Sequence, residues 1–117
     1  MEVEHWKSVR MTLLTRSEEF VLLAVWRLQD GAYTLNIRER LSDLTTQEWS
    51  LGSVYTPLER LGRRRFLTSR LSDSTPDRGG RKRRIYSLTK PGKDALIKIR
   101  AVETTMWAGV QEMLLDS

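Results

Sequence analysis

A dense run of basic residues around two glycines is the segment of this chain best suited to chemistry. It reads Arg-Gly-Gly-Arg-Lys-Arg-Arg over residues 78–84 and separates two short β-prone runs, 66–72 and 85–88. Glycines turn a chain tightly at little steric cost, and guanidinium groups beside such a turn bind phosphate oxygens. We therefore predict a basic hairpin tip, or wing, over 73–84 that contacts a phosphate backbone. The contact residues we assign to it are Gly79, Gly80, Arg81 and Arg83.

The positive charge of the chain is concentrated around this run. Residues 60–84 hold ten basic and two acidic side chains, whereas all 117 residues together carry a net charge of +5. A strongly basic face on a mildly acidic body is the electrostatic pattern of a polyanion-binding protein. The alternative is a solvated arginine-rich loop, and the hairpin position of the run favours the polyanion.

Residues for other kinds of chemistry are missing from the sequence. There is no cysteine, which excludes disulfides and thiolate nucleophiles, and His5 is the single histidine, which excludes a histidine cluster or a catalytic triad. We therefore expect no enzyme, no metal and no cofactor. No apolar stretch approaches 18 residues and no signal-peptide pattern is present, so we expect a cytoplasmic protein that does not contact a membrane.

Caps and periodicity predict the elements that position the basic run. Residues 15–18, Thr-Arg-Ser-Glu, have the pattern of a capping box before the apolar run 20–26. Thr34 and Ser50 are expected to cap two further helices. The expected elements in chain order are a core helix that ends at Gly31, a helix over 34–44, a short strand over 45–49, a helix over 51–64 and the two-stranded hairpin.

The helix over 51–64 has two faces. Val54, Leu58 and Leu61 recur at core spacing, whereas small polar residues and a tyrosine lie on the other faces. An ordinary amphipathic surface helix has the same spacing, but the element order is that of a winged helix-turn-helix, a mainly α fold with a small β-hairpin. We therefore expect this helix in the major groove of DNA. The residues assigned to DNA from it and its surroundings are Thr34, Arg38, Ser53, Tyr55, Thr56, Arg63 and Arg64.

Four short runs share a pattern with a known family. They are 51–55 (Leu-Gly-Ser-Val-Tyr), 58–61 (Leu-Glu-Arg-Leu), 79–89 (from Gly-Gly-Arg to Leu-Thr) and 92–96 (Gly-Lys-Asp-Ala-Leu). Together they resemble the PadR-like transcriptional regulators, over about residues 13–100. The resemblance implies a bacterial or archaeal homodimeric repressor that binds a near-palindromic double-stranded DNA operator. A winged-helix module for protein interaction or RNA binding is the alternative, since fold does not fix function.

The chain departs from the family at the end of the presumed recognition helix. Where the family usually has Leu-Glu-x-x-Gly, residues 61–65 read Leu-Gly-Arg-Arg-Arg. Arg65 then occupies the position that commonly adopts the left-handed turn, at a strain of about 1 kcal/mol or more. The added guanidinium groups strengthen the attraction to phosphates without adding sequence information.

The C-terminal residues predict a dimerisation helix. Thr89 caps it, Pro91 fits its first turn, and an apolar stripe then runs for more than six turns to the end of the sequence. A stripe this long exceeds what one small domain covers, so we expect a homodimer. The expected interface residues are Ile99, Val102, Met106, Trp107, Val110 and Met113. The expected divisions are an N-terminal extension or short helix (1–14), the DNA-binding domain (15–89) and the dimerisation helix (90–117).

Three tryptophans are candidates for an effector site. Drug-sensing members of the PadR-like family hold flat apolar compounds in an aromatic dimer cavity, and the resemblance implies the same role for Trp6, Trp26 and Trp107. The alternative is that they fill the core or the interface, as large aromatic side chains mostly do. Trp49 is expected in the core.

Overall fold

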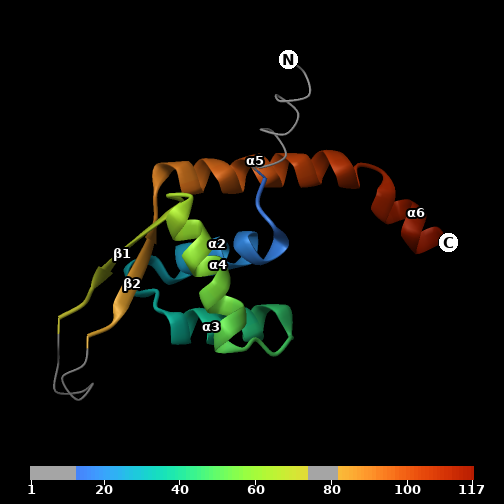
Figure 1. Ribbon diagram of the computed structural model, residues 1–117. Helices are drawn as coiled ribbons and strands as arrows, with labels where there is room; N and C mark the ends of the chain where they lie inside the picture. The colour runs from blue at the N-terminus through green and yellow to red at the C-terminus, as the bar shows by residue number, and fades with distance from the viewer. Residues whose placement is uncertain (1–12, 74–81) are drawn as a thin grey trace.

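The computed structural model describes residues 13–73 and 82–117. The expectations for the N-terminal segment with Trp6, and for Gly79, Gly80 and Arg81, lie outside the described residues. The helices are α2 (Arg16–Leu28), the 3-10 helix η1 (Gln29–Gly31), α3 (Thr34–Thr45), α4 (Leu51–Arg63), α5 (Lys90–Trp107) and α6 (Val110–Asp116), and the strands are β1 (Leu67–Leu71) and β2 (Arg84–Leu88). Figure 1 shows α5 lying across the group formed by α2, α3 and α4, with the hairpin at one end and α6 at the other.

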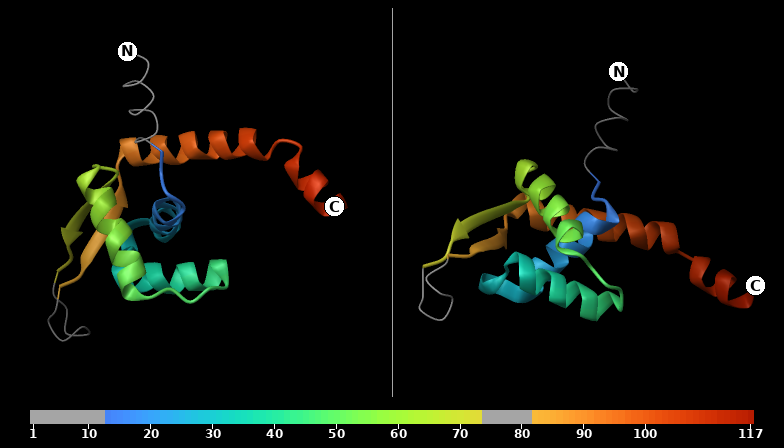
Figure 2. Two further views of the ribbon diagram at one scale, coloured as in Figure 1. Left: turned by 45° about the vertical axis from the view of Figure 1, so that its right-hand side comes forward. Right: turned by 60° about the horizontal axis from the view of Figure 1, so that its bottom comes forward.

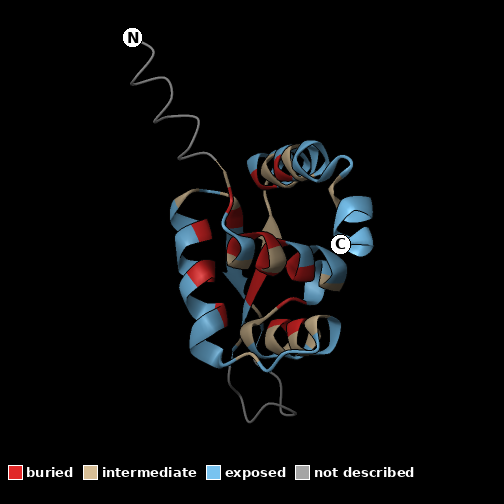
Figure 3. Cartoon of the chain, turned by 90° about the vertical axis from the view of Figure 1, so that its right-hand side faces the viewer, coloured by how far each residue is buried: buried red, intermediate tan, exposed pale blue. Residues whose placement is uncertain are grey.

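The core lies between α2, α3, α4 and the start of α5. Val54, Leu58 and Leu61 are buried, as their spacing predicts, and they face buried residues of α2 and α3. The buried residues gather on the inner faces of these helices, while most of α5 and all of α6 beyond it are exposed or half-buried (Figure 3). The described fold is therefore a three-helix body that carries a hairpin and a C-terminal arm, α5 and α6.

Three of the four predicted helix caps are confirmed, at Thr15, Ser50 and Thr89. The Glu18 N–H donates to Thr15 Oγ1 at 3.1 Å and the Thr15 N–H donates to Glu18 Oε1 at 2.8 Å, which completes a capping box. Ser50 Oγ accepts from the Ser53 N–H at 3.1 Å. The prediction for Thr34 is wrong by one residue. Tyr33 is the N-cap of α3, because the Asn36 side chain accepts from its N–H at 2.8 Å.

The predicted strand over 45–49 is also wrong. Helix α3 continues to Thr45, and Thr46 then turns the chain with a left-handed φ of 52°. β1 and β2 pair antiparallel, with Leu67 opposite Leu88. Ala32 forms the bridge to Tyr86, whose N–H donates to its carbonyl at 2.8 Å. Since β2 pairs with both β1 and Ala32, it has no edge left for residues 45–49.

The end of α4 is joined to the start of α5 through the backbone. The Phe66 N–H donates to the Leu61 carbonyl at 2.9 Å, and Arg65 has a φ of 63°, so the helix ends in a Schellman motif with arginine in the glycine position. Thr89, the N-cap of α5, donates through its hydroxyl to the Arg65 carbonyl and through its N–H to the Phe66 carbonyl. The left-handed arginine expected from the sequence is therefore confirmed, and its turn anchors α5.

The prediction of one continuous C-terminal helix is wrong. Helix α5 ends at Trp107, and Gly109 adopts a left-handed φ of 76° before α6 begins. Glycine adopts this conformation without steric cost, which ends one helix and redirects the next. Among residues 13–73 and 82–117, no helix is both long enough and apolar enough to cross a membrane.

Gly92 tests the junction between α4 and α5. A Cβ atom at this position would lie 2.2 Å from the Phe66 carbonyl oxygen, so the backbone must shift. We expect Gly92→Ala to lower the free energy of unfolding by roughly 1–3 kcal/mol, measured by urea denaturation. The control is Gly62→Ala, because nothing lies within 4 Å of that Cβ and alanine favours a helix. Equal stability of the two variants would contradict the close approach.

Candidate nucleic-acid interface

One face of α4 presents polar groups to solvent. Ser53, Tyr55 and Thr56 are exposed, while Val54 and Leu58 on the opposite face are buried. The Ser53 hydroxyl donates to the Ser50 carbonyl at 2.8 Å and keeps acceptor capacity. Tyr55 is 51% exposed, so about half of the residue is accessible to a binding partner. The structure thus brings together the three predicted residues of this helix.

Tyr55 lies near both an acidic and a basic neighbour. The pKa of its hydroxyl is raised, chiefly by the negative charge of Glu59 and then by hydrogen bonding to Glu59, whereas the charge of Arg84 opposes the rise. A raised pKa keeps the hydroxyl protonated, so it stays available as a donor and an acceptor. Strand β1 contacts α4, so the hairpin lies next to this helix. The exposed face of α4 therefore presents a neutral hydroxyl and a carboxylate beside a strand pair that carries Arg84.

The two described arginines at the base of the wing contact different neighbours. The Arg83 guanidinium carbon lies 4.1 Å from the centroid of the Tyr33 ring, a cation–π contact with the N-cap of α3. Arg84 donates from Nη1 to Ser69 Oγ across the hairpin at 3.0 Å. These contacts fix the base of the wing to α3 and hold one guanidinium on each side of the strand.

The predicted residues of α3 lie in different surroundings from those of α4. Thr34 is the first residue of α3 and is half-buried. Arg38, one turn later, lines a shallow pocket of about 300 Å³. The other residues of this pocket are Glu39, Ser42, Asp43, Glu48 and Trp49. Arg38 therefore lies among three carboxylates, which weakens its attraction for phosphate.

The arginines at the end of α4 divide between two roles. Arg64 Nη1 lies 3.1 Å from Glu18 Oε1, and its guanidinium carbon lies 4.7 Å from the centroid of the Phe66 ring. Arg60 Nε lies 3.8 Å from the second oxygen of Glu18, whereas Arg63 is exposed. Glu18 is only 2% exposed, so it is a buried carboxylate that two arginines of α4 neutralise in part.

Sequence reasoning missed this role of Glu18. The residue was assigned to the capping box alone, although a carboxylate beside the apolar run of a core helix requires a positive partner. That requirement, together with the arginines at the end of α4, was the available signal. Arg64 stays a predicted DNA contact, but its guanidinium also supports the fold.

The predicted dimer residues divide along the C-terminal arm. Ile99 is buried in the core of its own chain, and Val102 packs partly against that core, so Ile99 offers almost no surface to a partner. Val110 is half-buried. The remaining predicted residues, Met106, Trp107 and Met113, are 52–72% exposed. Periodicity alone did not distinguish the half of the stripe that covers the chain's own core from the half that faces outward.

The two described effector candidates are far apart. Trp26 of α2 lies beside the start of α5, and Trp107 is the last residue of α5. Trp26 is 48% exposed, and the Lys93 ammonium lies 4.9 Å from the centroid of its ring. Trp107 follows Lys93 by 14 residues, about 21 Å along the helix, so the two rings line no common pocket within one protomer. Trp107 instead borders an open groove of about 760 Å³ between α5 and α6. The partly buried Trp49 packs on the core, as predicted.

Glu19 of α2 is a second buried carboxylate near this groove. The pKa of Glu19 is raised, first by burial and then by hydrogen bonding to and repulsion from Glu103 of α5, while Arg16 acts in the opposite direction. Arg16 contacts both carboxylates, at 3.0 Å to Glu19 and 2.6 Å to Glu103. Glu103, which lies within the apolar stripe, is therefore paired with Arg16 of α2.

Sequence and fold are similar to those of known regulators. Residues 22–98 match the family model described as transcriptional regulator PadR-like family. A solved structure of a PadR-like transcription factor from Bacteroides fragilis is 22% identical with a TM-score of 0.68, over 97% of this chain and 99% of that one. A PadR-like transcriptional regulator from Bacillus cereus is 23% identical with a TM-score of 0.67, over 86% and 91%.

A third solved structure extends the comparison. A PadR family transcription regulator from Clostridium difficile R20291 is 24% identical with a TM-score of 0.63, over 84% of this chain and 97% of that one. The sequence has no significant match among curated proteins. These likenesses confirm the predicted winged-helix fold.

Substitutions of the neighbours Arg63 and Arg64 are expected to have different effects, one on DNA binding and the other on the stability of the fold. We expect Arg64→Ala to lower the free energy of unfolding by roughly 1–3 kcal/mol, because Glu18 stays buried with a weakened counter-charge. Arg63→Ala should change stability by no more than about 0.5 kcal/mol while reducing the slope of log affinity against log salt by about 1. Thermal unfolding and DNA titrations at several salt concentrations measure both effects. A loss of stability in Arg63→Ala, with a smaller salt slope only in Arg64→Ala, would refute these two roles.

Proposed function

Because this chain belongs to the PadR-like family of transcriptional regulators, we propose that it is a repressor that binds a near-palindromic operator as a homodimer. Family membership makes it a DNA-binding regulator rather than an enzyme. The observation that carries the finer proposal is the exposed polar face of α4 beside the arginines of the hairpin. In this proposal α4 enters the major groove and the wing lies on the backbone or in the minor groove.

The exposed face of α4 has the groups that base recognition needs. The major groove is about 12 Å wide and admits a helix, and each base pair presents a distinct set of donors and acceptors there. Tyr55, Ser53 and Thr56 supply hydroxyl groups that donate or accept. Glu59 adds a carboxylate, which accepts from the amino group of cytosine and is repelled by phosphate. We therefore assign base contacts to this face and phosphate contacts to the arginines around it.

The hairpin supports the proposed backbone contact by its position. β1 and β2 extend away from the helical body on the side of α4 (Figure 2). Strand β1 contacts α4, so the helix and the hairpin are neighbours in the proposed interface. Each phosphate neutralised by such a surface contributes about 0.9 to the slope of log affinity against log salt.

Exposed apolar side chains on the C-terminal arm support the homodimer. The residues concerned are Met106, Trp107, Met113, Leu114 and Leu115, which are 52–76% exposed. No residue of α6 is fully buried against the described part of its own chain. Several large apolar side chains exposed on one arm mark an association site. A twofold dimer would place its recognition helices about 34–36 Å apart, one turn of the duplex, and so requires an operator with matching symmetry.

Repression is the regulatory action we assign. The described residues form the DNA-binding domain and the arm, so occupation of a promoter is the simplest action available to them.

The competing function is a protein-interaction or RNA-binding module. The decisive experiment sequences the genomic fragments that the purified protein retains at physiological salt. Enrichment of a near-palindromic promoter site supports the proposal, and equal retention of unrelated duplexes or single-stranded RNA contradicts it.

Tyr55 is expected to carry sequence preference. Tyr55→Ala should lower operator affinity by about 1–3 kcal/mol while leaving most non-specific affinity, since phosphate contacts are unaffected. Tyr55→Phe keeps the ring and removes the hydroxyl, so it reports how much of this loss is due to hydrogen bonding. Fluorescence anisotropy on operator and scrambled duplexes gives both affinities. Operator affinity that survives both substitutions would leave Tyr55 as surface packing.

Met113 is expected to contribute to the dimer contact. Met113→Glu introduces a charge into the exposed apolar surface, where burial against a partner would be costly, so the variant should be monomeric at micromolar concentration. Gln111→Glu is the matched control, because it adds the same charge to an exposed position of the same helix. Light scattering measures both masses. A single-chain mass for the unmodified protein rules out the dimer.

A further inference from the structure

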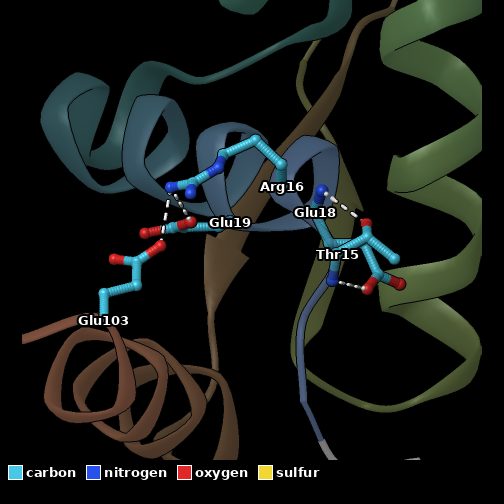
Figure 4. Close-up of polar contacts among 5 residues, drawn as sticks. All are labelled: Thr15, Arg16, Glu18, Glu19 and Glu103. Atoms are coloured by element: carbon cyan, nitrogen blue, oxygen red, sulfur yellow. Dashed lines mark hydrogen bonds and ion pairs between the residues drawn. The ribbon is translucent and has the colours of Figure 1, made fainter. Parts of the chain in front are cut away.

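The first turn of α2 carries two successive buried carboxylates that contact different helices. Glu18 is 2% and Glu19 is 6% exposed. Glu18 meets Arg64 at the end of α4. Glu19 shares Arg16 with Glu103 of α5, as Figure 4 shows. One turn of helix is therefore in polar contact with both the recognition helix and the C-terminal arm.

The contact between α2 and α5 brings two carboxylates together around one arginine. Glu19 and Glu103 are mutually repulsive, and their side chains are only 8% and 18% exposed. A single guanidinium bridges them, from Arg16 at the first position of α2. Buried like charges cost stability unless a counter-charge is held in a defined position. The bridge therefore fixes geometry between α2 and α5 more than it adds stability.

The bridge lies where α5 leaves the body. Ile99 and Val102 are the last α5 residues that pack on the core, and Met106 and Trp107 beyond Glu103 are largely exposed. From Glu103 to the end of α6 is 13 residues, which at the helical rise is at most about 20 Å. A rotation of about 10° at Glu103 would thus displace the end of a straight arm of that length by about 3 Å. A displacement of this size approaches the rise of one base pair, about 3.4 Å.

We propose that the bridge between Arg16, Glu19 and Glu103 sets the angle of the C-terminal arm to the winged-helix domain, and thereby fixes the distance between the two recognition helices. This inference rests on the proposed homodimer. Arg16 and Glu103 are positioning residues, since they act through α2 and α5 rather than on DNA. Glu18, adjacent in sequence, ties α4 to the same turn, so the angle of the arm is transmitted to the recognition helix.

The test measures tolerance to half-site spacing. The probes are duplexes that carry the two operator half-sites with the spacer unchanged, or lengthened or shortened by one base pair, together with a single half-site. The unmodified dimer should bind the unchanged spacer at least about tenfold more tightly than the altered ones, because a displaced half-site loses base contacts. Glu103→Gln should reduce that ratio to below about threefold, while dimer mass and single half-site affinity are unchanged.

Two further variants make the result specific. Arg16→Ala should broaden the spacing preference as Glu103→Gln does, and the double variant should be no broader than either single one, since all remove the same bridge. Asp94→Asn is the matched control, because Asp94 is an exposed carboxylate of α5 that pairs only within its own helix, with Lys90 at 3.1 Å. It should keep the sharp spacing preference.

The outcomes separate this inference from the function on which it rests. If the unmodified protein is monomeric or ignores the second half-site, the proposed function fails first. If it shows a sharp spacing preference that Glu103→Gln and Arg16→Ala retain, the positioning role is overturned and the proposed function stands. If the variants lose half-site affinity together with spacing preference, the bridge is only structural and the inference is likewise overturned.

Discussion

The buried carboxylate of Glu18 is the constraint on which the arrangement of the described helices depends. One of its oxygens accepts the Thr15 N–H and meets Arg64, and the other faces Arg60. A carboxylate this deeply buried is tolerated only while its donors remain in place. The start of α2 and the end of α4 must therefore keep their relative position. The Arg64 guanidinium also covers Phe66, whose carbonyl meets the start of α5, so the constraint extends to the C-terminal arm.

This constraint changes how the basic charge of residues 60–84 should be counted. The sequence gives that segment ten basic groups, but Arg60 and Arg64 partly neutralise Glu18, and Arg83 is stacked on Tyr33. Salt dependence reports phosphates neutralised rather than arginines present. The slope for DNA should therefore correspond to fewer contacts than the composition suggests. Exposed basic groups such as Arg63, Arg70 and Arg84 remain available for the proposed phosphate contacts.

Local features were predictable from the sequence, and features that depend on a distant partner were not. The capping box at Thr15 and the buried positions Val54 and Leu58 follow from short-range spacing, and the structure confirms them. The strand over 45–49 failed because pairing needs an open strand edge, and Ala32 occupies it.

The same limit applies to the C-terminal arm and to the site. Spacing identified the apolar stripe of α5 but could not reveal that Ile99 covers the chain's own core, nor that Gly109 ends the helix. The hydroxyl-bearing residues of α4 are exposed, as their spacing indicates, whereas the second role of Arg64 required knowledge of which helix lies opposite. The chemistry of each side chain could thus be predicted from the sequence, but the residue that it contacts in the fold could not.

The division of α5 into a fixed and an exposed half explains how one helix can serve both folding and association. Its start is fixed by the close approach of Gly92 to the Phe66 carbonyl, and its middle by the packing of Ile99 and the bridge at Glu103. Beyond that bridge the apolar side chains contribute little to the fold of their own chain, so association can use them without loosening the core. Because both halves belong to one rigid helix, the packing that stabilises the protomer would also set the direction in which the arm meets its partner in the proposed dimer.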